Sequence, residues 1–248
     1  MQPFGALADV YDAMMDDFDY PKWAEYYRAL LGRAGVFPGT IYDAGCGTGS
    51  MALEFARLGA RVTGADLSGA MLRRAGEKFR AAGESAMLVC QDMCELSVPR
   101  PVDAVVSVCD GVNYLLTEAR LRAFFRAARA AIRPGGALAF DISSRHKLEK
   151  RLGNAFLGEE REDIAYLWEN RLDAQRHLVK MDVTFFVREA DGRYRRFQER
   201  HAQRAHSGEE LVELLGEEGF SGIEVFGDRT FAPPADDEER LHFLARRA

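Results

Sequence analysis

The chain has 248 residues, a mass of 27.7 kDa and 47% hydrophobic residues, which is enough to build one sizeable α/β domain with an insertion. Its formal net charge of -6 and pI near 5.5 disfavour a protein that holds nucleic acid in a general positive field, and they favour a small-molecule partner. No run approaches the ~20 apolar residues of a membrane helix, and residues 1–16 lack the basic and apolar stretches of an export signal. We therefore expect a cytoplasmic protein with no membrane partner, present as a monomer or a homodimer.

All four cysteines lie in the first half of the chain, within expected strands and the loops at their ends: Cys46, Cys90, Cys94 and Cys109. This usage is typical of reduced, structural thiols. The spacing of Cys90 and Cys94 would suit half of a metal site, but no second Cys/His pair stands at finger-like spacing. We therefore expect no metal centre at these thiols.

Two helices are expected before the first strand. One spans residues 6–15, and the other begins at Pro21 and stops at Gly32, where proline and glycine occupy the usual start and end positions. Short β-rich runs and helical patterns then alternate. The β-rich runs cover residues 40–43, 61–65, 87–90, 104–108 and 137–142, and the helical patterns cover 49–58, 68–82 and 118–132. Because strand and helix alternate, we expect right-handed crossovers and a parallel sheet.

The alternation stops at residues 164–205, where three extended stretches follow one another with no helix between them. Asp191-Gly192 provides a turn between two of these stretches, so this segment is expected to be antiparallel. A capping box from Ser207 to Glu210 then begins a helix over residues 211–215, and Gly219 follows its end. Two further strands at 223–226 and 241–245 complete a sheet of seven strands.

The segment Ile41-Tyr42-Asp43-Ala44-Gly45-Cys46-Gly47-Thr48-Gly49 carries most of the functional information. An apolar strand runs into three glycines at alternate positions, where the backbone must turn sharply and let a ligand approach the N–H groups at a helix start. The third glycine comes one residue too early for the G-x-G-x-x-G dinucleotide fingerprint. A nicotinamide cofactor, and with it an oxidoreductase, is therefore disfavoured.

Acidic residues follow the next two strands. Asp66 ends the second strand 21 positions after Gly45, where it can accept hydrogen bonds from both hydroxyls of a ribose; the alternative role is to cap the helix from Ser68. At the end of the third strand, Asp92 could receive an adenine amino group and Met93 could lie against the ring, unless Asp92 is a plain loop carboxylate. The pattern predicts a nucleoside site.

These residues resemble motifs I, II and III of the class I S-adenosylmethionine-dependent methyltransferases, over about residues 38–145. The resemblance implies that S-adenosylmethionine is the cofactor, with Asp43 and the glycine loop at its methionine end, Asp66 at the ribose and Asp92 with Met93 at the adenine. Arg133-Pro134-Gly135-Gly136 is similar to the R/K-P-G-G of the family before its fifth strand. The cofactor-binding residues expected on this basis are Tyr11, Asp43, Gly45, Cys46, Gly47, Gly49, Asp66, Leu67, Met71, Gln91, Asp92, Met93 and Cys109.

A narrower resemblance, to small-molecule N-methyltransferases and especially those acting on amino sugars, rests on Tyr11-Asp12, Asp19-Tyr20 and the antiparallel insert. In those enzymes the N-terminal helix and the insert cover the active site. Tyr11 and Tyr20 would then lie over the donor or the acceptor, and the alternative is that both are core aromatic residues.

The expected fold is thus α/β, a Rossmann-like seven-stranded and mostly parallel sheet with helices on both faces and a three-stranded antiparallel lid insert. Residues 1–36 would form an N-terminal helical cap, 37–148 the core that binds S-adenosylmethionine, 149–206 the substrate lid, and 207–248 the C-terminal part of the core sheet.

Methyl transfer from a sulfonium mainly requires alignment and exclusion of water, and a base is needed only when the acceptor arrives protonated. The catalytic candidates are Tyr20, Asn113, Tyr114 and His201. Asn113 and Tyr114 follow the fourth strand and could hydrogen-bond the acceptor, whereas His201 is either a base in the cleft or a histidine on a solvated strand face. Asp110 and Asp141 with Asn113 would be the alternative as a magnesium site, which we disfavour.

We therefore predict methyl transfer to a nitrogen or oxygen of a small molecule. Two alternatives stay open, namely methylation of RNA or protein and a non-catalytic domain that binds S-adenosylmethionine. Arginines in the insert hint at an anionic acceptor: Arg188, Arg193, Arg195, Arg196, Arg200 and Arg204. Because acidic residues are interleaved with them, a face of mixed charge is the simpler interpretation, and nucleic acid stays a disfavoured partner.

Overall fold

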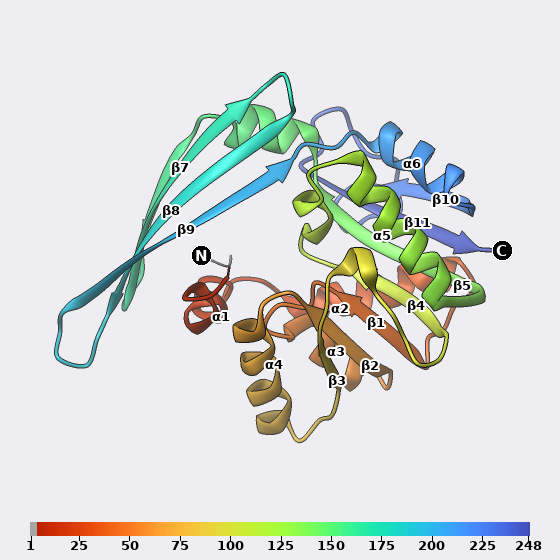
Figure 1. The fold of residues 1–248 in the computed structure, drawn as a ribbon, viewed down its shortest axis with the longest axis horizontal. Coiled ribbons are helices and arrows are strands. Elements are labelled where there is room, and N and C mark those ends of the chain that lie inside the picture. Colours follow the sequence, from red (N-terminus) through yellow and green to blue (C-terminus); the bar gives the residue numbers. More distant parts are fainter. Residues whose placement is uncertain (1–3) are drawn as a thin grey trace.

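Two β-sheets organise residues 4–248, the part of the chain that the computed structural model describes (Figure 1). The larger sheet has seven strands in the order β10-β11-β5-β4-β1-β2-β3. Strands β1 to β5 are parallel, whereas β11 runs antiparallel to both of its neighbours. The bounds are β1 Thr40–Ala44, β2 Arg61–Asp66, β3 Met87–Cys90, β4 Val102–Ser107, β5 Ile132–Ser143, β10 Phe220–Phe226 and β11 Arg240–Arg247. The predicted Rossmann-like sheet is confirmed.

Helices cover both faces of this sheet. Three helices pack on one face, α2 Tyr20–Arg33, α3 Ser50–Arg57 and α4 Gly69–Ala82, and two pack on the other, α5 Glu118–Ala131 and α6 Gly208–Glu217. Four of these helices begin with a side-chain cap, in which a backbone N–H of the first turn is accepted by Asp19, Ser68, Thr117 or Ser207. The longest of these helices has 14 residues, and none within residues 4–248 is long and apolar enough to cross a bilayer.

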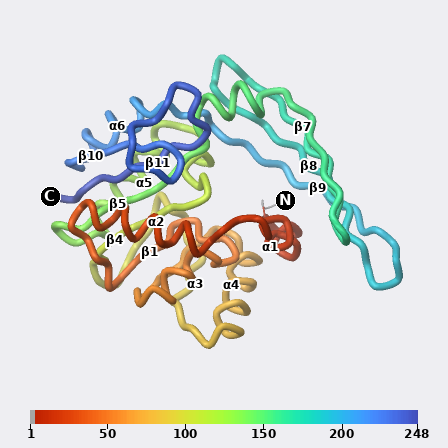
Figure 2. Tube along the Cα trace, turned by 180° about the vertical axis from the view of Figure 1, so that it is seen from behind, coloured from red at the N-terminus to blue at the C-terminus, as the bar shows by residue number. Residues whose placement is uncertain are grey.

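The insert is an antiparallel sheet that curves away from the core, as Figures 1 and 2 both show. It has four strands rather than the expected three: β6 Phe156–Glu160, β7 Ile164–Asp173, β8 Leu178–Arg188 and β9 Tyr194–Arg204. The additional strand β6 is short, largely exposed and interrupted by Gly158, so it carries no alternating apolar pattern, and it is a strand because its backbone pairs with β7. We call this sheet the lid sheet.

The N-terminal segment differs from the single helix expected at residues 6–15. A short 3-10 helix, Leu7–Asp9, precedes a four-residue α-helix, α1 Tyr11–Met14, and Val10 between them has a φ of -121°. The break has a tertiary cause, because Leu7 and Val10 pack against the lid sheet while Asp12 bonds to the core. Figures 1 and 2 show α1 lying between α4 and the lid sheet.

Four further details complete the fold. Strand β5 begins at Ile132, five residues earlier than expected, because an irregularity in its pairing with β4 accommodates the Pro-Gly-Gly turn. Short 3-10 helices follow β3 (η2, Met93–Glu95) and β4 (η3, Gly111–Tyr114). A π-helical segment, η4 Lys147–Leu152, leads from β5 into the lid sheet.

The stacked pair Phe140 and Phe243 generates a stability prediction. Both rings are fully buried, lie 4.7 Å apart and join the antiparallel strand β11 to β5. Phe243→Ala should lower the free energy of unfolding by about 3–5 kcal/mol, since it removes a packed ring and leaves a cavity. The measurement is urea denaturation. The matched control is Phe37→Ala, because Phe37 is 82% exposed and its loss should change little; equal effects of the two substitutions would contradict this account of the core.

Candidate active site

The loop after β1 turns through three glycines that all adopt positive φ angles, 83° at Gly45, 55° at Gly47 and 78° at Gly49. L-residues rarely adopt this conformation, which explains the residue type at each position. Gly49 has a second constraint, because a Cβ there would lie 2.9 Å from the Cβ of Ala75 in α4. At Gly47 a Cβ would meet nothing within 4 Å, so the space above the middle of the loop is open.

Asp66, at the end of β2, joins this loop to the start of α4. Its carboxylate accepts the N–H of Gly47 at 2.9 Å and the N–H of Ser68 at 2.7 Å. Burial raises the pKa of Asp66, and the two backbone bonds act in the opposite direction. The capping role that was the alternative for Asp66 is filled by Ser68, whose hydroxyl accepts the N–H of Met71. Asp66 is therefore placed beside the loop, where its assignment to the ribose stays a prediction.

Asp43, near the end of β1, is the most unusual acidic residue of the site. It is 1% exposed, and among the described residues its Oδ2 atom has no hydrogen-bond partner. Burial, and secondarily the charge of Asp66, raises the pKa of Asp43 to about 7. A buried carboxylate oxygen without a partner is costly, so it indicates a place where a cationic ligand group would restore the lost interaction.

The loop after β3 lies against the glycine loop. The Cε atom of Met93 would be 3.4 Å from a Cβ at Gly45 and 3.8 Å from one at Gly111, so the ends of β1, β3 and β4 meet around this methionine. Asp92 accepts the N–H of Cys94 and binds Arg120 at 2.9 and 3.0 Å, which holds the pKa of this carboxyl low although burial acts to raise it.

Gln91 accepts the hydroxyl of Tyr42 at 2.7 Å and the N–H of Ser97, and its amide donates to Glu95. The geometry thus shows Gln91 organising the loop after β3. Leu67 is 59% exposed beside Asp66, whereas Cys46 and Met71 are buried at 9% and 2%. The assignment of these residues to the cofactor stays a prediction.

The end of β4 contains two consecutive non-glycine residues in the left-handed region, Cys109 with φ 62° and Asp110 with φ 54°. The carboxylate of Asp141, which is fully buried on β5, accepts the N–H of Cys109 at 2.8 Å and that of Asp110 at 3.1 Å. The same carboxylate accepts the hydroxyl of Tyr27 and pairs with Arg240 of β11. The buried carboxylate of Asp141 thus stabilises the strained left-handed conformation of Cys109 and Asp110.

Arg240 also contacts Asp110 at 3.2 Å, so its guanidinium lies between two carboxylates at the position where a metal was the alternative. Arg240 holds the pKa of Asp110 below its usual range although burial acts to raise it, so Asp110 is ionised. Gln203, from the lid strand β9, donates to Asp110 at 2.8 Å and also bonds the hydroxyl of Tyr114. Sequence analysis missed Gln203 and Arg240, since neither stands at an informative spacing from β4.

Four of the predicted aromatic and catalytic residues come together above β4. Tyr11 and Tyr20 both lie near Cys109, and burial raises the pKa of each. Tyr114 lies near Tyr11 and contacts His201 edge-on, with ring centroids 6.1 Å apart. His201 is mostly buried on the inner side of the lid sheet, and its Nδ1 atom has no hydrogen-bond partner within residues 4–248. Burial lowers its pKa, so the imidazole is neutral at physiological pH.

Asn113 requires a correction. Its side-chain amide donates to the carbonyl oxygens of Ser143 and Arg204 at 3.1 and 2.9 Å, and its oxygen accepts the N–H of Ser143 at 2.9 Å. The residue is fully buried, so both amide hydrogens are engaged away from any cleft. Asn113 fastens η3 to β5 and to the end of β9, and the prediction that it hydrogen-bonds an acceptor is wrong.

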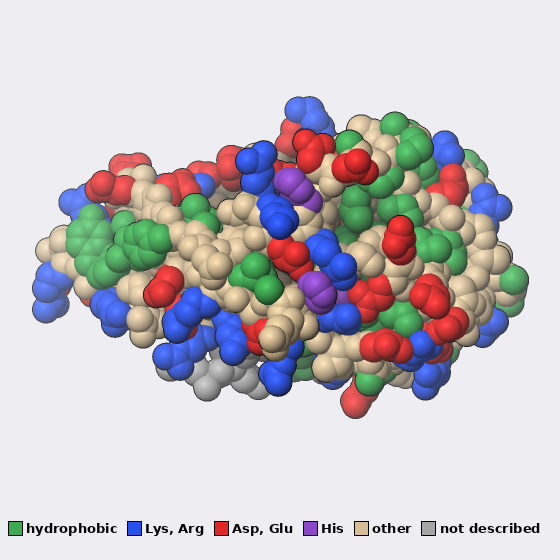
Figure 3. All heavy atoms as spheres, turned by 90° about the horizontal axis from the view of Figure 1, so that it is seen from above, with side chains coloured by type: hydrophobic (Ala, Val, Ile, Leu, Met, Phe, Trp, Pro, Cys, Tyr) green, Lys and Arg blue, Asp and Glu red, His purple; other side chains and the backbone are tan. Residues whose placement is uncertain are grey.

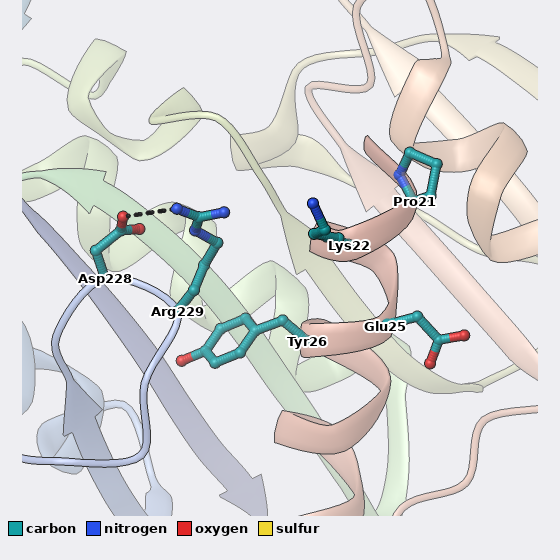
Figure 4. A pocket seen from close by; sticks show the side chains of 6 residues that line it. All are labelled: Pro21, Lys22, Glu25, Tyr26, Asp228 and Arg229. Atoms are coloured by element: carbon teal, nitrogen blue, oxygen red, sulfur yellow. Dashed lines mark ion pairs between the residues drawn. The ribbon is translucent and has the colours of Figure 1, made fainter. Parts of the chain in front are cut away.

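A separate hollow of about 550 Å³ lies between the start of α2 and the loop after β10, where Arg229 faces Asp228 (Figure 4). The ring of Trp23 lies 5.9 Å from Arg229 in this hollow and 5.2 Å from Arg240 in the site. The two places are therefore neighbours, but no residue that lines the hollow belongs to the predicted site.

Comparison with known proteins identifies the class of enzyme. A family profile described as a methyltransferase domain matches residues 41–136. A protein of Geobacillus sp. (strain WCH70), named as a methyltransferase with no stated acceptor, is 34% identical over 247 residues and covers 98% of this chain and 99% of its own. The chain therefore belongs to the class I S-adenosylmethionine-dependent methyltransferases, and S-adenosylmethionine is its cofactor.

Two solved structures extend the comparison. An S-adenosylmethionine-dependent methyltransferase from Clostridium acetobutylicum ATCC 824 has a TM-score of 0.88 and 29% identity, with 97% of both chains covered. The sugar N-methyltransferase KedS8 from Streptoalloteichus sp. ATCC 53650 shares the fold, with a TM-score of 0.77 and 21% identity over 96% of this chain and 93% of that one. Because the alignments span more than nine-tenths of each chain, the shared fold includes the lid sheet as well as the core.

The residues at the carboxyl edge of the sheet fit this cofactor. The unpartnered carboxylate oxygen of Asp43 suits the ammonium group of its methionine moiety, and the open space over Gly47 leaves the turning backbone accessible. Asp66 and Met93 lie on two sides of the same loop, which suits a nucleoside. These contacts support the predicted placement of the cofactor at this edge, which stays a prediction.

The raised pKa of Asp43 leads to a pH prediction. The cationic cofactor favours the ionised carboxylate, whereas the free protein protonates Asp43 as the pH falls through about 7. The affinity for S-adenosylmethionine should therefore weaken below pH 7, approaching about tenfold per pH unit. Calorimetry from pH 5.5 to 8.5 measures it. Asp43→Asn should bind more weakly at pH 8 and lose this dependence, while an equally flat profile in the wild type would refute the role of Asp43.

Proposed function

We propose that this methyltransferase acts on a small molecule at a nitrogen or oxygen, with the lid sheet and the N-terminal segment enclosing the acceptor. The observation that supports this most is the placement of Tyr11, Tyr20, Tyr114 and His201 in one aromatic, largely buried group above β4. An enclosed group of this kind suits a compact acceptor better than an RNA strand or a folded protein. The likeness in fold to a sugar N-methyltransferase agrees with an amine acceptor.

The chemistry asks little beyond positioning. S-adenosylmethionine supplies a methyl group on a sulfonium, so the chain must align the acceptor, exclude water and remove the proton of an acceptor that arrives protonated. His201, which is neutral and has a free Nδ1, is the residue that we assign to the proton. The ionised Asp110, held by Arg240 and Gln203, would stabilise the positive charge that develops on an acceptor nitrogen.

The lid arginines give little support to the RNA alternative. Four of the six each have a carboxylate partner, in the pairs Arg193–Asp191, Arg195–Glu189, Arg200–Asp182 and Arg204–Glu210. Figure 3 shows basic and acidic side chains intermixed over the face that it presents. This favours the interpretation of a solvated face of mixed charge over a groove for a phosphate backbone.

The direct test is a panel of acceptors with methyl-labelled S-adenosylmethionine. Small amines and amino sugars, small alcohols and phenols, RNA and a protein mixture are incubated separately with the enzyme, and label transfer is counted. Label should enter a small amine or hydroxyl compound. Transfer to RNA or protein alone would select that alternative, and tight cofactor binding with no transfer to any class would select a non-catalytic binding domain.

His201→Gln provides the sharper prediction about catalysis. Because the substitution removes the neutral imidazole and keeps a side chain of similar polarity, kcat should fall by about 10²-fold while the affinity for S-adenosylmethionine stays within twofold of the wild type. In the wild type, kcat should fall only at acidic pH, below the usual range of a histidine, because burial lowers the pKa of His201. His177→Gln is the control, because His177 lies at a half-buried turn of the lid sheet and bonds Glu149. Unchanged kcat in the His201 variant would exclude it as the base.

A further inference from the structure

The N-terminal strap, which we define as residues 4–16, bonds to the cofactor side of the core. Asp12 accepts the hydroxyl of Thr48, inside the glycine loop, at 2.6 Å, and it also binds Lys78 of α4 at 2.9 Å. The carbonyl oxygen of Phe4 accepts the hydroxyl of Ser68, two residues after Asp66. The strap therefore runs along the ends of β1 and β2, next to the loop that we assign to the cofactor.

The opposite side of the strap bonds to the lid sheet. Glu199, in the middle of β9, accepts the N–H of Phe4 at 3.2 Å and the N–H of Leu7 at 3.3 Å. Leu7 and Val10 pack with a group of apolar lid residues, of which Phe185 is almost fully buried. The strap is thus held between the core and the lid sheet, and it cannot move without breaking contacts to at least one of them.

The burial of Glu199 needs an explanation. The residue is 3% exposed, and among residues 4–248 no lysine, arginine or histidine forms an ion pair with it. Removing an unpaired carboxylate from water is costly, and here two backbone N–H groups of the strap are what offset the cost. A hollow of about 300 Å³, lined in part by Asp12, Tyr20 and Lys78, lies on the core side of the strap.

We propose that Glu199 is a positioning residue that holds the strap across the cofactor site, so that the lid sheet controls how fast the cofactor leaves. In this role Glu199 acts through the backbone of Phe4 and Leu7. This inference needs only the cofactor, so it does not depend on which acceptor the enzyme methylates.

The test is a chase experiment that needs no acceptor. Protein loaded with tritiated S-adenosylmethionine is diluted into excess unlabelled ligand, and retained label is followed on filters. Glu199→Ala should release label about tenfold faster, and Glu199→Gln less so, because the amide oxygen can still accept one N–H. Hydrogen exchange of residues 4–16 should rise in both variants. Glu169→Ala, an exposed carboxylate on the same sheet, is the control and should match the wild type.

Asp12→Asn tests the other attachment of the same strap and serves if Glu199→Ala does not fold. It should also speed release, and the double variant Asp12→Asn, Glu199→Gln should be little faster than the faster single variant, because either break frees the same strap. Release at the wild-type rate despite faster exchange in residues 4–16, or fully multiplicative effects of the two substitutions, would overturn the proposal. If a Glu199 variant methylates its acceptor at the normal rate and also releases the cofactor at the wild-type rate, the proposed function stands. This role of Glu199 is then rejected.

Discussion

Carboxylates that accept backbone N–H groups are the interaction on which the rest of the site depends. At the carboxyl edge of the sheet the chain turns through left-handed residues whose N–H groups leave the strand ladder and need other acceptors. Asp66 fills this need for Gly47, and Asp141 fills it for Cys109. Glu199 does the same for the strap from the lid sheet. The loops at this edge of the sheet are therefore shaped by the protein itself, without a ligand.

This arrangement concentrates negative charge in one place and then neutralises only part of it. Arg240 forms ion pairs with both Asp110 and Asp141, whereas one carboxylate oxygen of Asp43 has no partner among the described residues. Such a site costs stability in the free protein, and it suits a ligand and a reaction that bring positive charge. The strap and the lid sheet, which contact one another beside this edge, would also limit the access of water to it.

Much of the fold could be predicted because its signals are local. The apolar runs, the Pro-Gly-Gly turn and the capping serines each act within a few residues, and the seven-stranded sheet follows from their alternation. The strand β6 could not be predicted, because it forms through backbone pairing with β7. The break at Val10 could not be predicted either, because it arises from contacts of the segment with the lid sheet and with the core. In the site, the spacing from the glycine loop predicted Asp66, and the resemblance to the methyltransferase family added Asp43. Arg240 stands 99 residues from Asp141 with no pattern to connect them. The prediction for Asn113 failed for a related reason. Its position after β4 suggests a contact with the acceptor, but its side-chain amide hydrogen-bonds the backbone of Ser143 and Arg204, which are distant in sequence.

The central claim is that the amino group of the methionine moiety of S-adenosylmethionine lies at the buried carboxylate of Asp43, with the ribose beside Asp66. A crystal structure with S-adenosylmethionine or S-adenosylhomocysteine bound tests this most directly. The account predicts that the amino group of the methionine moiety reaches Asp43, directly or through one water, and that the ribose hydroxyls face Asp66. A ligand bound elsewhere, or one that leaves the Asp43 oxygen as isolated as before, would contradict it.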